Sequence, residues 1–173
     1  MFFLPTKNPC CNAVLAEAMT RRILVLDGAM GSMIYAYEPN EHDYRGNRFA
    51  NHSVPLKNCT EILILSKPDM IRSIHSAYLE AGADIIETDS FNSNKLSMAE
   101  FELDHLVSEL NRKAAEVARD TADAFTRKNP DKPRFVAGSI GPTKKTLSLG
   151  TDVDDPGRRS VTFDQMVDNY FEP

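Results

Sequence analysis

Acidic side chains follow short apolar runs at two points of the sequence, and this pattern is typical of a ligand site. Asp27 follows the run ILVL and precedes GAMGS, and Glu87 follows two isoleucines in the segment GADIIETDSFNSN at 82–94. An unpaired charge at the end of a buried strand is costly, so a cation normally accompanies it. The two carboxylates therefore indicate a site for a small polar ligand that carries an ammonium group.

Each acid also has an ordinary structural explanation, and the residues alone leave the choice open. Asp27 is equally suited to cap the turn that follows it. Glu87 needs a cationic partner, which is either another side chain of the protein or the substrate. Gly28 and Gly31 would let backbone N–H groups approach an anionic group, but GAMG lacks the spacing of a dinucleotide-binding loop.

Three short apolar runs predict strands at residues 23–27, 83–88 and 134–140. Because predicted helices separate them, the expected arrangement is a parallel sheet with the helices outside. Ligands bind such sheets at the carboxyl ends of the strands. Asp27 and Gly28, the segment 87–90 and the segment 139–141 should therefore meet at one edge.

Helical spacing and capping signals predict the other elements. One helix should run from an N-cap at Ser66 to a stop at Gly82, and a second should cover residues 99–127. The capping box of Thr162 and Gln165 opens a third helix. The apolar face of the first helix is predicted to hold Ile71, Ile74, Ala77, Tyr78 and Ala81.

Composition indicates one soluble domain and excludes several function classes. The 173 residues suffice for a real core, and a net charge of −5 argues against a general nucleic-acid or polybasic membrane binder. No apolar run approaches the roughly 20 residues that span a bilayer. The N-terminal MFFLP lacks the basic residues of a signal peptide. We expect a cytoplasmic protein with neither nucleic acid nor a membrane as its partner.

The three cysteines, Cys10, Cys11 and Cys59, show no metal-binding spacing. A structural zinc site normally has paired, closely spaced ligands, whereas here no C-x-x-C occurs and the four histidines are scattered. We interpret the adjacent Cys10 and Cys11 as free thiols. Cys59 falls in the polar stretch 38–60, which is predicted to be a long loop. Long loops in compact domains are usually functional or mobile.

Several motifs, taken in order, resemble the N-terminal homocysteine-binding region of cobalamin-dependent methionine synthases. They are ILVLDGAMGSMI, DYRG, AGADIIETDSFNSN, RFVAGSIGPTKKTLS and DVDDPGRRSVTFDQMV, and they span about residues 21–171. The segments DYRG and GPTKKTLS resemble the cobalamin-dependent enzymes more than the methyltransferases that use betaine or S-methylmethionine.

The resemblance implies a (β/α)8 barrel in which zinc activates the homocysteine thiol as a thiolate. Methylcobalamin would supply the methyl group, and other domains of the enzyme would recharge it from methyltetrahydrofolate. The resemblance also implies that Asp27 and the region from Glu87 to Asn92 hold the amino-acid end of homocysteine. With the strand ends included, the predicted substrate-binding residues are Asp27, Gly28, Glu87, Thr88, Phe91, Asn92, Ser139 and Gly141.

Departures from the family pattern concern the metal and the extent of the chain. The family holds zinc through three cysteines on late strands, whereas Cys10 and Cys11 precede the first strand. We therefore expect no residue of this chain to ligate zinc or cobalamin. The expected fold is α/β, comprising the first three βα units of the barrel. Residues 1–20 would form an N-terminal extension or helix, and residues 21–173 a C-terminally incomplete barrel domain.

Three functions follow from these patterns. The first is the homocysteine-binding portion of a methionine-forming methyltransferase, inactive as an isolated chain. The second is a non-catalytic truncated product that binds a partner through its open barrel edge, where N–H and C=O groups are unpaired. The third is a fragment of a methyltransferase of the betaine or S-methylmethionine type.

Overall fold

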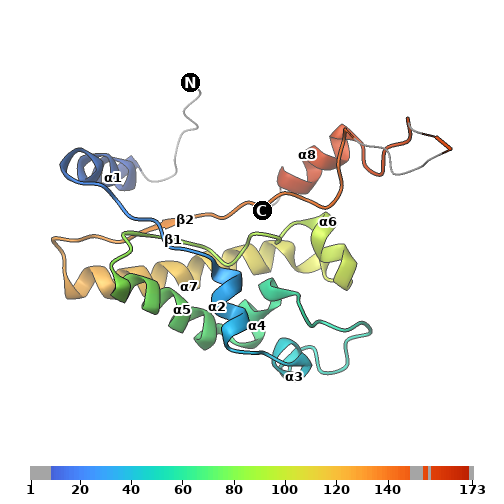
Figure 1. The fold of residues 1–173 in the computed structure, drawn as a ribbon, viewed down its shortest axis with the longest axis horizontal. Coiled ribbons are helices and arrows are strands. Elements are labelled where there is room, and N and C mark those ends of the chain that lie inside the picture. Colours follow the sequence, from blue (N-terminus) through green and yellow to red (C-terminus); the bar gives the residue numbers. More distant parts are fainter. Residues whose placement is uncertain (1–8, 149–153, 156, 172–173) are drawn as a thin grey trace.

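A small parallel sheet packs on a layer of helices in the computed structural model, which describes residues 9–148, 154–155 and 157–171 (Figure 1). β1 (Ile85–Glu87) pairs in parallel with β2 (Phe135–Ala137). Leu26 forms a single parallel bridge with Ile85 on the other edge of β1. The predicted α/β class and parallel strands are confirmed, whereas three barrel units stay a prediction.

Helices make up most of the described chain. In chain order they are α1 (Pro9–Arg21), α2 (Met30–Ala36), α3 (Glu41–Arg45), α4 (Leu63–Ser66), α5 (Pro68–Ala81), α6 (Lys95–Met98), α7 (Val107–Lys128) and α8 (Phe163–Phe171). Short 3-10 turns lie between some of them: η1 (Thr60–Ile62), η2 (Ala99–Phe101) and η3 (Asp104–Leu106). Of the helices that the structure describes, none is both long and apolar enough to cross a membrane.

The larger part of the core lies among helices α2 to α7, and α5 and α7 pack together on one side of the sheet in Figure 1. α7 faces this core with residues at helical spacing, among them Leu110, Ala114 and Val117. A smaller cluster directly under the sheet joins Leu79, Ile86, Ala118 and Ala122. α1 and α8 lie toward opposite ends of the strands, with α8 at the carboxyl ends.

The prediction of a buried strand at 23–27 is wrong in both extent and burial. The carbonyl of Val25 accepts the N–H groups of Asp84 and Ile85, at 2.8 and 3.1 Å, but only one bridge forms. The side chains of Ile23 and Val25 are 89% and 55% exposed. They are exposed because no described helix or strand covers this face of the sheet.

The predicted starts of the first two helices, at Ser66 and at residue 99, are also wrong. Ser66 is the last residue of α4, and its hydroxyl donates to the carbonyl of Ile62 at 3.3 Å, so α5 begins at Pro68 without a side-chain cap. α7 begins at Val107 rather than at residue 99. Glu102 has a positive φ of 57°, which ends the preceding turn and keeps the two segments from forming one helix.

Other capping signals are confirmed. Gly82 ends α5 with a φ of 113°, a conformation that favours glycine. Thr162 and Gln165 exchange the two hydrogen bonds of a capping box before α8, at 2.9 and 3.2 Å. Within α5, however, Ala77 is exposed and His75 is buried instead. Burial lowers the pKa of His75 to about 4, so its imidazole is neutral at physiological pH.

Two side chains of α3 organise the stretch predicted as a long loop. The Arg45 guanidinium donates to the carbonyls of Phe49, Ala50, His52 and Val54, at 3.3, 3.4, 2.8 and 3.0 Å. The Glu41 carboxylate binds Arg45 Nε at 2.6 Å and accepts the N–H groups of Leu56 and Lys57, at 2.8 and 2.7 Å. The DYRG motif therefore has a structural role in this chain, because its arginine holds the loop.

We predict that Arg45→Lys lowers the free energy of unfolding by about 2–3 kcal/mol, because an ammonium cannot reach carbonyls spread over this loop. Urea denaturation measures the loss. Arg112→Lys is the matched control, since Arg112 forms an exposed ion pair with Glu116 on the surface of α7. Its effect should stay below about 0.5 kcal/mol. Equal losses in the two variants would contradict the structural role of Arg45.

We also predict that the isolated chain self-associates through its exposed apolar side chains. Ile23 and Ile140 are 89% and 71% exposed, and β2 has an unpaired outer edge in the described structure. Sedimentation velocity at micromolar concentration should show oligomers, and changing both isoleucines to serine should reduce them. A monomer that unfolds in a single sharp transition would count against this prediction.

Candidate functional site

Polar groups from all three parallel segments meet at their carboxyl ends, as predicted. The Asp27 N–H donates to the carbonyl of Ile85 at 2.9 Å, and the Glu87 N–H donates to Asp27 Oδ2 at 3.0 Å. On the other edge of β1, the Thr88 N–H donates to the carbonyl of Ala137 at 3.0 Å. The backbone ladder therefore places the two acids side by side, whereas their role in substrate binding stays a prediction.

Asp27 holds a charge that the described protein does not neutralise. Its Oδ1 atom is buried and has no hydrogen-bond partner among the described residues. Burial raises the pKa of Asp27 to about 6, and the nearby charge of Glu87 adds to the rise, while the N–H of Glu87 opposes it. An acid in this state gains most from a cation that enters from outside.

Glu87 is half-buried and directly follows the buried Ile86. Its side chain makes no ion pair with any residue that the structure describes. The internal salt bridge, which the sequence left open as an explanation, is therefore not found in the described chain. With Asp27 beside it, Glu87 contributes to a negative patch that suits an ammonium group.

A hydroxyl network joins the ends of β1 and β2. Thr88 Oγ1 lies 2.7 Å from Ser90 Oγ and accepts the N–H of Ser139 at 2.9 Å. Ser90 Oγ in turn donates to the carbonyl of Ser139 at 2.9 Å. Thr88 and Ser90 are both buried. In this arrangement Thr88, predicted to bind substrate, holds the strand ends together.

The two glycines of the predicted set sit where a side chain would collide or crowd. A Cβ atom on Gly141 would lie 2.5 Å from the carbonyl oxygen of Phe91, which also accepts the Gly141 N–H at 2.8 Å. A Cβ atom on Gly28 would approach the Tyr78 hydroxyl to 3.2 Å. Phe91 itself leaves 51% of its surface exposed beside this contact.

Asn92 is held by Glu61. Its backbone N–H and its side-chain amide both donate to Glu61 Oε1, at 3.1 and 2.9 Å. The N-cap of α6 is Asn94, whose side chain accepts the N–H of Ser97 at 3.0 Å. Neither Asn92 nor Ser93 caps the next helix, because Asn94 occupies that position.

Sequence reasoning missed a buried group of acids and a thiol behind the site. Glu61 and Asp89 are only 4% and 5% exposed, and Asp89 Oδ2 has no partner among the described residues. Burial, assisted by the charge of Glu61, raises the pKa of Asp89 well above its usual value. Burial also raises the pKa of the Cys59 thiol to about 12. No local signal marks Glu61, since its partner Asn92 is 31 residues away.

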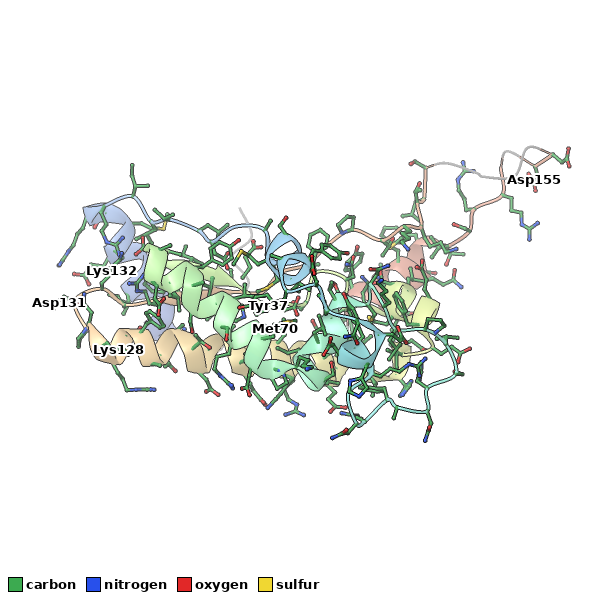
Figure 2. The ribbon with its side chains drawn as sticks, turned by 60° about the horizontal axis from the view of Figure 1, so that its bottom comes forward. Tyr37, Met70, Lys128, Asp131, Lys132 and Asp155 are labelled. Atoms are coloured by element: carbon green, nitrogen blue, oxygen red, sulfur yellow. The ribbon has the colours of Figure 1, made fainter. Side chains whose placement is uncertain are left out.

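At the opposite end of the strands, the buried acid Asp84 is paired with cations of the protein itself. Asp84 accepts Arg22 Nη1 at 2.6 Å and the N–H of Val25 at 3.0 Å, and Lys132 lies 3.6 Å away. Figure 2 shows Lys132 at the same end of the molecule as α1. Burial favours the protonated form of Asp84, but the bond from Arg22 keeps its pKa below the usual value.

The sequence resemblance implies zinc, which needs three or more donor side chains close together. Over residues 9–148, 154–155 and 157–171, no group of three or more His, Cys, Asp or Glu side chains could hold a metal ion. Cys10 and Cys11 lie within α1, but their side chains are outside the described set. The described residues therefore do not fit a zinc centre.

These features define an α/β protein whose strand ends present two adjacent carboxylates. A family model described as homocysteine S-methyltransferase matches residues 24–173. The chain therefore belongs to the homocysteine S-methyltransferase family.

Solved structures agree with this assignment. The homocysteine methyltransferase MmuM from Escherichia coli in its metallated form is 27% identical over 74% of this chain, with a TM-score of 0.58. The oxidized form of the same protein is 29% identical over 78% of this chain, with a TM-score of 0.57. Each match covers 41% of the E. coli chain, so the present chain spans about two fifths of its length.

We predict that Asp27→Asn stabilises the ligand-free chain at pH 7 by about 1–3 kcal/mol. The folded pKa of about 6 exceeds the ordinary 3.8, so ionising Asp27 destabilises the fold as the pH rises from about 4 to 6. Asparagine removes this loss and keeps an oxygen for the N–H of Glu87. Urea midpoints at pH 4 and pH 7 measure the difference.

Asp84→Asn is the control with the opposite sign. Because the pKa of Asp84 is lowered by its bond from Arg22, its charge stabilises the fold above the unfolded pKa, and the variant should be less stable at pH 7. A stability loss in both variants at pH 7 would show that Asp27, like Asp84, is satisfied within the protein.

Proposed function

We propose that this chain forms the homocysteine-binding part of a homocysteine S-methyltransferase. Asp27 and Glu87 would bind the ammonium group of the substrate at the strand ends. The homocysteine thiolate attacks the methyl carbon of a donor, so that a sulfur–carbon bond forms and the bond from the methyl group to the donor breaks. The products are methionine and the demethylated donor.

One observation carries this proposal: two carboxylates lie side by side without a cation from the described chain. Among the described residues, buried Asp27 Oδ1 has no hydrogen-bond partner and Glu87 makes no ion pair. Family membership supplies the substrate class, because its members are described as homocysteine S-methyltransferases. An amino-acid substrate brings the ammonium group that the two acids lack.

The motifs DYRG and GPTKKTLS support methylcobalamin as the methyl donor, and other domains of the enzyme as partners that recharge it from methyltetrahydrofolate. Zinc bound to the thiol would lower its pKa and so supply the thiolate. Since the described residues do not fit zinc, any such ion needs ligands from elsewhere. We place this activity in the cytoplasm.

A second candidate function is partner binding through the uncovered sheet. Ile23, Val25 and Ile140 are exposed, and the outer edge of β2 is unpaired in the described structure. These features favour association with another polypeptide, whether or not methyl transfer occurs.

The test of the proposed site is calorimetry with L-homocysteine and with 4-mercaptobutanoate, which lacks the amino group. Asp27→Asn and Glu87→Gln should each weaken homocysteine binding roughly tenfold to a hundredfold, because each removes a charge-assisted hydrogen bond. Neither substitution should weaken binding of 4-mercaptobutanoate. Glu116→Gln on the surface of α7 is the control and should leave homocysteine binding unchanged.

Wild-type affinity for homocysteine in both variants would make Asp27 and Glu87 structural strand-end residues. Equal weakening of the two ligands would also contradict the proposal, because it would mean that the acids act on folding rather than on the ammonium group.

A further inference from the structure

α8 lies across the carboxyl ends of the strands and is fastened there by few polar contacts. The Tyr170 hydroxyl donates to the carbonyl of Gly141 at 2.8 Å, and Asn169 Oδ1 accepts the N–H of Leu96 at 2.8 Å. Asn169 is 2% exposed, so its side chain is buried in this contact. The first contact joins α8 to the loop after β2, and the second joins it to α6.

A small cavity lies under this helix. It has a volume of about 10 Å³, and its lining residues are Ser90, Phe91, Ser93, Asn94, Ser139, Ile140, Gly141 and Tyr170. A cavity of this size holds about one water molecule, so homocysteine does not fit. The wall includes three predicted substrate-binding residues, Phe91, Ser139 and Gly141, and α8 contributes Tyr170.

The closed position leaves polar atoms unsatisfied. Ser93 Oγ and Asn169 Nδ2 are buried and have no hydrogen-bond partner among the described residues. Buried polar atoms without partners disfavour the state that buries them. In addition, Phe163, Val167 and Phe171 of α8 are 68%, 48% and 88% exposed, so these apolar residues hold the helix to the strands only weakly.

We propose that α8 is a latch over the strand-end cavity, which opens locally while the core stays folded. Opening breaks the Tyr170 and Asn169 contacts, hydrates Ser93 Oγ and uncovers Ser139 and Gly141. The significance of the latch for substrate access rests on the proposed function. The opening itself does not, and it can be measured without homocysteine.

Thiol labelling tests the latch in the full chain. In a background with Cys10→Ser and Cys11→Ser, Ser93→Cys places a thiol under α8, while the native Cys59 reports global unfolding because it is 0% exposed in the core. Iodoacetamide labelling followed by peptide mapping gives both rates from one sample. Cys at position 93 should react at least about tenfold faster than Cys59, since local opening is cheaper than global unfolding.

Tyr170→Phe should raise the labelling rate at position 93 about two- to tenfold, the effect of losing one neutral hydrogen bond, and leave the rate at Cys59 unchanged. Tyr35→Phe on α2 is the matched control, because Tyr35 is 56% exposed and remote in sequence from the latch. It should change neither rate. Equal rates at the two thiols, or an equal rise of both in Tyr170→Phe, would overturn the proposal.

Hydrogen exchange on the unmodified chain decides the question if the cysteine variant does not fold. The N–H of Leu96, which donates to Asn169, should exchange faster than the N–H groups of Val117 and Ala118 in α7. The same exchange rate at all three positions would mean that α8 leaves only when the whole protein unfolds, and the latch would be excluded.

Discussion

The pairing of β1 on both of its edges is the interaction on which the site depends. On one edge the backbone of β1 bonds to Val25 and Asp27, and on the other it bonds to β2. This pairing places polar groups that are far apart in the sequence within one hydrogen-bonded patch. Because strands of a parallel sheet end at the same edge, every polar residue that follows them adds to the same site.

The acids at the two ends of these strands, Asp84 and Asp27, differ in their partners. The partners of Asp84 indicate a structural role, whereas those of Asp27 are typical of a binding site. Asp84 is surrounded by Arg22, Lys132 and a backbone N–H group, so its charge belongs to the fold. Each acid leaves one oxygen without a hydrogen-bond partner among the described residues, but Asp27 accepts the N–H of Glu87 and forms no ion pair with a described residue, so its charge costs stability in the ligand-free chain. Such a cost at a strand end is typical of a binding site, where a ligand later offsets it.

Elements outside the sheet hold the loops around this patch. Arg45 and Glu41 fix the segment that leads to Glu61, and Glu61 fixes the loop after β1 through Asn92. α8 then covers the strand ends through Tyr170. The E. coli relative is more than twice as long as the aligned part, and the exposed face near Ile23 is left uncovered by the described chain.

The sequence by itself determined the α/β class, the succession of α5, β1, α7, β2 and α8, the stop at Gly82 and the capping box before α8, because these depend on residues close together in the chain. It also indicated the strand-end acids, since a carboxylate after an apolar run is a local signal. Only the tertiary structure decided that residues 23–27 are exposed, that Glu61 binds Asn92, and that Tyr170 closes over Gly141. Burial and hydrogen bonds between distant residues depend on which surfaces meet, and no local pattern specifies that.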